Sequence, residues 1–268
     1  MRSLNYFMKK ILLFTALYIT TGSVFAQVDT LPSNAPELKV AETTVPKAKK
    51  KYDLSKRPND HFLLQLGYTQ WLGQPDSIDT KGFSRSINTY FMFDFPFKSS
   101  QQLSAAIGLG VGSDHIIFNR DYPDVKGQTN TMRFNYRTTS PDTTYFKKTK
   151  LATTYLEAPV ELRYVMKPDQ SDKSFKFALG VKVGTMIKAG TRARRLMELD
   201  GGRENLLNDY LLKESSKKYF NTTRIVGTAR IGFGHFTVFS TYQFTNLLKD
   251  GAGPELRPFT LGLSIGGL

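Results

Sequence analysis

The stretch Ile87-Asn88-Thr89-Tyr90-Phe91-Met92-Phe93-Asp94-Phe95-Pro96-Phe97 alternates in character at almost every step. Its odd-numbered positions are apolar apart from Thr89, and its even-numbered positions include Asn88 and Asp94. Successive side chains of a β-strand point to opposite faces, so this period of two predicts a strand with one apolar face and one more polar face.

The same alternation recurs in seven other segments. With residues 85–97, the predicted strands are 61–72, 102–112, 153–166, 174–188, 222–233, 236–247 and 257–266. Most are near the roughly 9–11 residues that a tilted strand needs to cross a membrane, and their connections alternate between long and short. The pattern predicts an all-β fold, a closed eight-stranded antiparallel transmembrane β-barrel of up-and-down topology in the outer membrane, with both termini in the periplasm. A soluble barrel with reversed faces is the alternative, but the charged residues share the face that carries the glycines.

The two N-terminal segments differ from the rest of the chain. Residues 1–26 combine Arg2, Lys9 and Lys10 with an apolar run and small residues before Gln27, which is the pattern of a secretory signal peptide. Residues 27–60 are rich in proline and lysine and contain almost no aromatic residue, so we expect a disordered periplasmic tether. The barrel domain is then residues 61–268.

The composition limits the kinds of bonds, metal sites and partners that the chain can have. The chain of 268 residues has no cysteine, which excludes disulfides and thiolate metal sites. The formal charge is +14, and removal of the signal takes away three basic residues and no acidic one, leaving +11. On an exported chain this excess indicates contact with outer-membrane lipid and lipopolysaccharide phosphates, or a solvated basic surface, rather than nucleic acid. We expect no cofactor and no metal.

Charged residues fall on the predicted inner face of several strands. A closed eight-stranded barrel has room only for its own side chains, so such charges must pair. We expect a salt-bridged lumen, with Glu157 and Lys182 as a cross-strand pair, and an ion pathway or anion site as the less favoured alternative. The candidates for lumen ion pairs are Asp94, Glu157, Glu161, Arg163, Lys176, Lys182, Arg224 and Arg230, and Lys188 is expected to face inward with them.

Three finer expectations concern the walls of the barrel. The glycine-rich inner face of residues 102–112 leaves space for bulky neighbours in a narrow lumen. Pro159 cannot donate a ladder hydrogen bond and predicts a bulge. Outward aromatic residues near the strand ends predict membrane girdles, at Phe62, Trp71, Phe95, Phe97, Tyr164, Phe175, Phe233, Phe236 and Tyr242.

Two motifs resemble a known family. Tyr155-Leu156-Glu157-Ala158-Pro159-Val160-Glu161-Leu162-Arg163-Tyr164 and Arg257-Pro258-Phe259-Thr260-Leu261-Gly262-Leu263 are similar to strands of the PorT-like outer membrane β-barrel family of Bacteroidota. The resemblance covers residues 61–268 and implies a barrel and, for some members, a role in type IX secretion. The ending Gly266-Gly267-Leu268 departs from the aromatic residue on which many outer-membrane barrels finish.

The second long connection, residues 191–219, is a candidate partner-binding loop. It carries Arg192, Arg194, Arg195 and Tyr210, and its leucines have a spacing that suggests a short helix capping the barrel or docking a protein partner.

Hydrolytic chemistry is the competing class. Ser113-Asp114-His115 holds residue types used in nucleophilic catalysis, but three adjacent residues of a strand cannot converge their side chains. We therefore predict no catalytic residues and a non-enzymatic outer-membrane protein with a structural, partner-binding or secretion-accessory role. The alternative is an outer-membrane hydrolase acting on lipid or peptide at the barrel rim.

Overall fold

The computed structural model describes residues 62–80, 83–119, 121–134, 144–200 and 203–266, so the expected signal peptide and tether lie outside the described residues. One short 3₁₀ helix, η1 (Pro168–Lys173), accompanies the strands. The nine strands are β1 (Phe62–Leu72), β2 (Arg85–Phe97), β3 (Ser100–Phe118), β4 (Thr144–Val165), β5 (Phe175–Asp200), β6 (Arg203–Ser215), β7 (Thr223–Phe233), β8 (Phe236–Gln243) and β9 (Arg257–Gly266).

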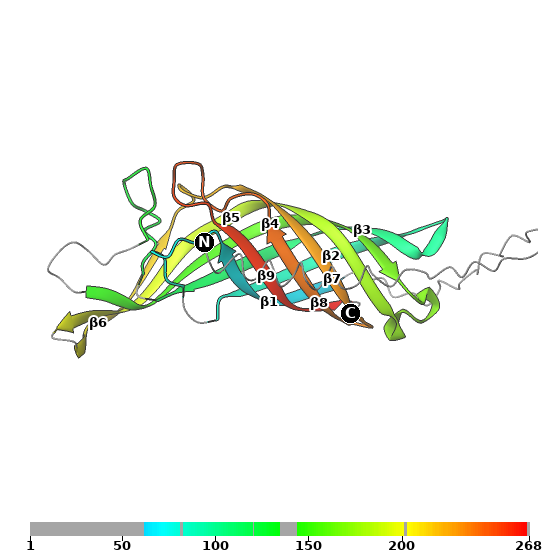
Figure 1. The fold of residues 1–268 in the computed structure, drawn as a ribbon, viewed down its shortest axis with the longest axis horizontal. Coiled ribbons are helices and arrows are strands. Elements are labelled where there is room, and N and C mark those ends of the chain that lie inside the picture. The colour runs from blue at the N-terminus through cyan, green and yellow to red at the C-terminus, as the bar shows by residue number, and fades with distance from the viewer. Residues whose placement is uncertain (1–61, 81–82, 120, 135–143, 201–202, 267–268) are drawn as a thin grey trace, which may run out of the picture. The chain divides into compact units, whose positions relative to one another are not determined.

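Eight of these strands form a closed ring. Every neighbouring pair is antiparallel, in the order β1-β2-β3-β4-β5-β7-β8-β9, and β9 pairs back to β1 (Figure 1). The ninth strand, β6, lies outside the ring and pairs only with the far half of β5. The predicted closed eight-stranded antiparallel barrel is therefore confirmed, with one strand that the sequence did not predict.

The faces of the ring strands follow the predicted alternation. Along β2, Tyr90 and Met92 are buried inside, whereas Phe91 and Phe93 are exposed on the exterior. Leu179 and Leu263 are each 66% exposed on other strands. A continuous apolar exterior of this extent is rare on a soluble monomer and fits contact with lipid. Within the described residues, no helix has the length and apolarity to cross a membrane.

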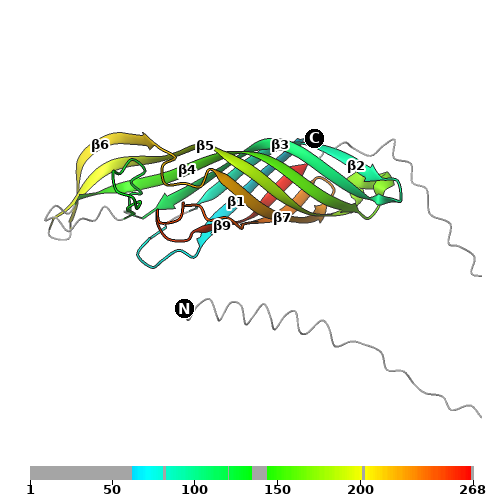
Figure 2. The same cartoon turned by 90° about the horizontal axis from the view of Figure 1, so that it is seen from above.

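The two ends of the barrel differ. The long-loop end carries residues 216–222, residues 244–256 and the described parts of the connections between β1 and β2 and between β3 and β4. The short-turn end carries residues 98–99, 166–174 and 234–235. Leu63 pairs with Gly266, so the first and last strands of the barrel begin and finish together at the short-turn end. Figure 2, which views the barrel from above, shows β6 and the adjoining parts of β4 and β5 at the opposite end from the turn that joins β2 and β3.

Exposed aromatic side chains ring the short-turn end. They include Phe62, Phe97, Phe175 and Phe233, and the rings of Phe175 and Phe233 lie 5.3 Å apart. The expectation for Trp71 was wrong, because Trp71 has the inward parity of β1 and is 5% exposed.

A bulge changes the direction of one predicted lumen lysine. The register of β4 with β5 shifts between Thr154 and Tyr155. The bulge predicted at Pro159 is not observed, because the pairing of β4 with β3 is interrupted there without a change of register. The shift adds one residue to β5 beside Ile187, so both Ile187 and Lys188 are exposed. Lys188 therefore points outward, contrary to expectation.

The long connections contain more strand than predicted. β3 continues to Phe118, β4 begins at Thr144, and β5 continues to Asp200. The expected helix in residues 191–219 is wrong, because this segment is the end of β5 followed by β6. The edge of β5 offers β6 a full set of backbone partners, and this tertiary pairing overrides the spacing of the leucines. We call residues 144–152 of β4, residues 189–200 of β5 and β6 the extension.

Candidate functional site

Five side chains from five strands meet halfway along the lumen and form what we call the central cluster. The Nε of Arg224 donates to Glu157 Oε1 at 2.7 Å, and its Nη1 donates to Asp114 Oδ2 at 2.6 Å. Lys182 Nζ lies 3.6 Å from Glu157 Oε2 and donates to the Tyr90 hydroxyl at 2.9 Å. The Tyr90 hydroxyl donates to Glu157. All five side chains are buried.

The strand register explains how these side chains meet. Glu157 is directly opposite Gly184, and Lys182 is directly opposite Pro159, so Glu157 and Lys182 approach on a diagonal. A Cβ on Gly112 would lie 2.8 Å from Glu157 Oε2 and 2.9 Å from an Arg224 nitrogen, so any larger residue would displace these charged groups. The glycines of the inner face leave the space that the central cluster fills, as predicted.

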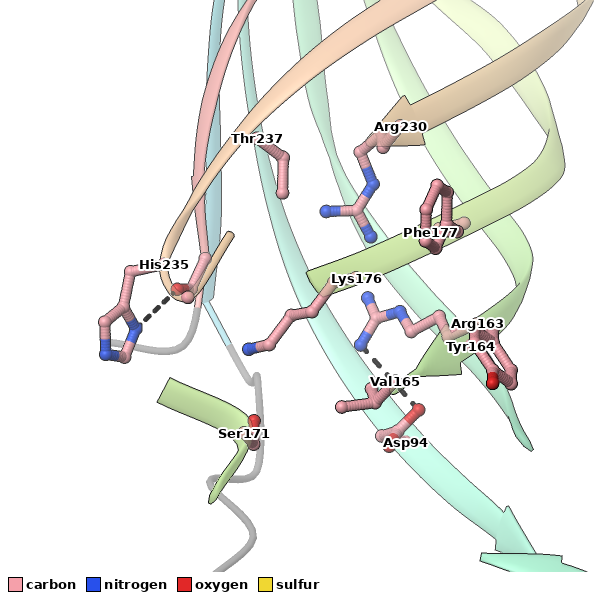
Figure 3. A pocket seen from close by; sticks show the side chains of 13 residues that line it. Asp94, Arg163, Tyr164, Val165, Ser171, Lys176, Phe177, Arg230, His235 and Thr237 are labelled. Carbon is pink, nitrogen blue, oxygen red and sulfur yellow. Dashed lines mark hydrogen bonds and ion pairs between the residues drawn. The ribbon is translucent and has the colours of Figure 1, made fainter. Parts of the chain in front are cut away.

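A second group, the mouth cluster, lies nearer the short-turn end. Arg230 Nη2 donates to Glu161 Oε2 at 2.5 Å, and Arg163 Nε donates to the same oxygen at 3.1 Å. Arg163 Nη1 also lies 3.8 Å from Asp94 Oδ1. In Figure 3 the side chains of Arg163, Lys176 and Arg230 project toward one space between their strands. That space is a cavity of about 30 Å³, which holds no more than two or three waters.

Carboxylates pair with cations in both clusters, and the central cluster balances its charges. The central cluster holds two carboxylates and two cations, and the mouth cluster pairs two carboxylates with two arginines beside Lys176. A cavity of only about 10 Å³ lies next to the central cluster. Buried ions that are paired and hydrogen-bonded in this way fill a barrel and lock its register, and so small a free volume disfavours a pathway for solutes.

The structure thus brings all eight predicted lumen residues into two groups. Two members of the central cluster, Tyr90 and Asp114, and one neighbouring ring, Tyr155, were not predicted as partners. Tyr90 was placed on the inner face without a role. Asp114 lies two residues past the predicted end of its strand, and Tyr155 stacks under the Arg224 guanidinium with 3.7 Å between the Arg224 Cζ and the ring centroid. Alternation continued beyond residue 112 would have revealed Asp114.

The long-loop end is covered by an apolar cap. Trp71, Phe118 and Phe134 pack with ring centroids 5.6–6.4 Å apart, and loop residues such as Phe220 and Leu256 are fully buried beside them. The connections at this end therefore fold over the barrel and close it above the central cluster.

The extension carries the four residues of the predicted partner-binding loop. Arg192 and Arg194 point to the exterior from β5. Arg195 has a φ of 58° at a register irregularity and lies 3.6 Å from Asp209. The ring of Tyr210 on β6 contacts that of Phe146, with centroids 5.9 Å apart.

Part of the inner face of the extension is covered by a preceding loop. The Tyr122 hydroxyl donates to Glu214 at 2.5 Å and accepts from Thr191 at 3.4 Å. Burial, with this bond to a carboxylate, raises the pKa of Tyr122, so its hydroxyl remains a donor at neutral pH. The exterior face of the extension, the free edge of β6 and the partly exposed side chains of Leu206 and Tyr210 remain open.

The residues considered for hydrolysis do not form a triad. Ser113 Oγ and His115 Nε2 lie 3.2 Å apart on the exterior, but Asp114 points into the lumen and binds Arg224. The Nδ1 atom of His115 has no hydrogen-bond partner, so no acidic group orients the imidazole. Among the described residues, no group of three or more His, Cys, Asp or Glu could hold a metal ion.

An apolar exterior, a charge-paired lumen and a ring of eight strands define a transmembrane β-barrel of the bacterial outer membrane. The chain belongs to the outer membrane protein beta-barrel domain family, whose sequence model matches residues 61–266. No curated protein matches the chain.

One similar solved structure is Ail, the attachment invasion locus protein of Yersinia pestis. It is 13% identical, and the match covers 78% of this chain and 97% of Ail with a TM-score of 0.31.

Proposed function

We propose that this outer-membrane protein is non-enzymatic and binds a protein partner through the free edge of β6. The observation that carries the proposal is the position of β6 outside the ring, paired on one side only. Every ring strand has a partner on both sides, so among the described strands β6 alone presents an open edge along its length.

An open edge is a template for another strand. Its unpaired N–H and C=O groups can pair with an extended segment of a partner, and pockets for alternate side chains add specificity. Proteins usually protect such edges, yet β6 exposes three large apolar side chains near its middle. Leu206 is 56% exposed, Leu207 is 48% exposed and Tyr210 is 40% exposed. An exposed apolar edge outside the barrel is better suited to recognition than to stability.

The rest of the barrel supports an anchoring role. The cap closes the long-loop end and the two clusters fill the lumen, so this architecture favours display over transport. In the proposed orientation the long-loop end faces outward, and both termini lie in the periplasm with a tether at residues 27–60 after signal cleavage before Gln27. Long loops outside and tight turns inside are the usual arrangement of outer-membrane barrels.

The same edge would serve an adhesion protein or an accessory of a secretion machine. The resemblance of residues 155–164 to the PorT-like family favours the second, including type IX secretion. The identity of the bound partner distinguishes these roles.

Co-purification from native membranes tests the proposal. Deletion of Arg203–Lys217 should leave a barrel that still migrates faster on a gel unheated than boiled, but should abolish recovery of the partner. The finer variant L206K/L207K places two lysines at the edge and should have the same effect. Its matched control is Q128K/N130K, which adds two lysines to another exposed connection and should retain the partner.

A result in the opposite direction would support hydrolysis. If His115→Ala abolished the biological phenotype while the deletion were tolerated, the partner-binding proposal would be wrong.

A further inference from the structure

Basic side chains gather on the exterior face where the barrel wall continues into the extension. Lys150 of β4 is directly opposite Arg192 of β5, and Arg192 is directly opposite Lys213 of β6. Arg85 of β2 lies close enough for its charge to act on Lys150. We call Arg85, Lys150, Arg192 and Lys213 the cationic row.

The arrangement is costly without an anion. Like charges directly opposite on neighbouring strands repel each other, because their Cβ atoms are only about 5 Å apart. Burial, together with the charges of Arg85 and Arg192, lowers the pKa of Lys150. No member of the cationic row forms an ion pair with a carboxylate of the described chain. Three adjacent cations without a carboxylate favour a ligand that carries several negative charges.

The row lies at the level where the membrane surface is expected. Arg85 pairs with Tyr68, whose ring packs 5.6 Å from that of Phe83, and both rings are exposed on the exterior. Exposed aromatic pairs at this height, opposite the phenylalanines of the short-turn end, mark the second interface of the membrane. The phosphate groups of lipid headgroups occupy that level.

An apolar groove runs down the exterior wall from Arg85. It has a volume of about 460 Å³ and is lined by Leu66, Ile87, Leu261 and Leu263, with Gly67 and Gly262 at its floor. A groove of this composition fits an acyl chain, and the guanidinium of Arg85 at its rim fits the phosphate above that chain.

We propose that the cationic row binds the phosphate groups of a phosphorylated glycolipid of the outer leaflet, of the lipid A type, with one acyl chain in the groove. The inference rests on the outward orientation of the long-loop end proposed above. It does not depend on a protein partner at β6. The site would fix the height and tilt of the extension over the membrane surface.

The test uses the purified full-length mature protein in neutral detergent micelles, with lipid binding followed by native mass spectrometry. The probes are diphosphoryl lipid A, monophosphoryl lipid A and the fully dephosphorylated glycolipid. We expect affinity to fall in that order. Excess inorganic phosphate should not displace diphosphoryl lipid A, which separates a lipid site from a site for free phosphate.

Two variants that each remove three positive charges test whether the lipid binds at the cationic row. K150Q/R192Q/K213Q should bind diphosphoryl lipid A about 100-fold more weakly, since each basic residue near an anionic surface contributes about fivefold. The control K98Q/K167Q/K173Q removes three exposed lysines from the short-turn end and should bind within about twofold of the wild type. If the first triple variant does not fold, Arg192→Gln alone should lower affinity about fivefold.

Three outcomes would overturn the proposal. One is equal binding of phosphorylated and dephosphorylated lipid. Another is an equal loss in both triple variants, which would indicate a response to net charge alone. The third is unchanged lipid binding in K150Q/R192Q/K213Q together with loss of a co-purified protein, which would assign the row to a protein partner. Loss of the partner in L206K/L207K with lipid binding intact would leave both proposals standing.

Discussion

Glu157 is the member of the central cluster whose loss should cost the most stability. It accepts from Arg224 and Tyr90 and lies 3.6 Å from Lys182, inside a lumen where it is 1% exposed. Glu157→Gln keeps the shape of the side chain but leaves two buried cations facing a single carboxylate, Asp114. Breaking a buried pair in this way costs about 3–5 kcal/mol, and we expect that loss in the free energy of unfolding.

The distances rank the two cationic partners. Arg224 reaches Glu157 at 2.7 Å with direct hydrogen bonds, whereas Lys182 lies at 3.6 Å. Coulomb energy falls with the inverse of distance, so the attraction of Glu157 to Lys182 is about three quarters of its attraction to Arg224. The hydrogen bonds of Arg224 add to this difference. In double-mutant cycles with Glu157→Gln, we expect a coupling energy of about 2–3 kcal/mol with Arg224→Met and about 1 kcal/mol with Lys182→Met.

The assay is urea unfolding of the protein refolded into lipid vesicles. The single tryptophan, Trp71, is buried in the apolar cap, so its fluorescence reports opening of the barrel end. The exposed pair Glu255–Arg257 is the control, with an expected coupling of about 0.5 kcal/mol or less. Additive losses for Glu157→Gln and Arg224→Met would refute the reasoning that these charges hold the barrel together.

Three further predictions follow from the fold. The mature protein should begin at Gln27, fractionate with outer membranes and migrate faster unheated than boiled, and recovery in the soluble periplasm would contradict a barrel. Gly112→Ala should lower the free energy of unfolding by about 1–3 kcal/mol through overpacking of the central cluster. Gly266→Ala should cost less than about 0.5 kcal/mol, because its methyl group would meet the flexible end of Leu63 at 3.2 Å and a backbone oxygen at an ordinary 3.9 Å. Because the bulge turns Lys188 outward, Lys188→Leu should leave urea stability unchanged while Lys182→Leu lowers it by about 3 kcal/mol, and equal losses would place both lysines in the lumen.

Much of the barrel could be predicted because a strand in lipid must alternate. The exposed Phe91 and buried Tyr90 follow directly from the period of two. The need to pair buried charges predicted the partnership of Glu157 with Lys182, but not the closer contact of Glu157 with Arg224. The family resemblance of residues 155–164 pointed to the same architecture.

The errors have specific physical causes. A bulge reverses the parity of a strand, and one residue of insertion beside Ile187 was enough to move Lys188 to the exterior. β6 was missed because its stability comes from the edge of β5, which no local pattern of leucines reveals. Trp71 was predicted to face outward because aromatic residues gather at membrane interfaces. The alternation along β1 places it on the inner face instead.

The edge of β6 is the proposed binding site for a protein partner. A photo-reactive amino acid placed at Leu207 in living cells tests this directly, with Asp250 at the same end of the barrel and Lys173 at the short-turn end as comparison positions. We expect a discrete protein adduct from position 207 and none from positions 250 and 173. An adduct from position 173 with none from position 207 would contradict the proposal, because the partner would then meet the opposite end of the barrel.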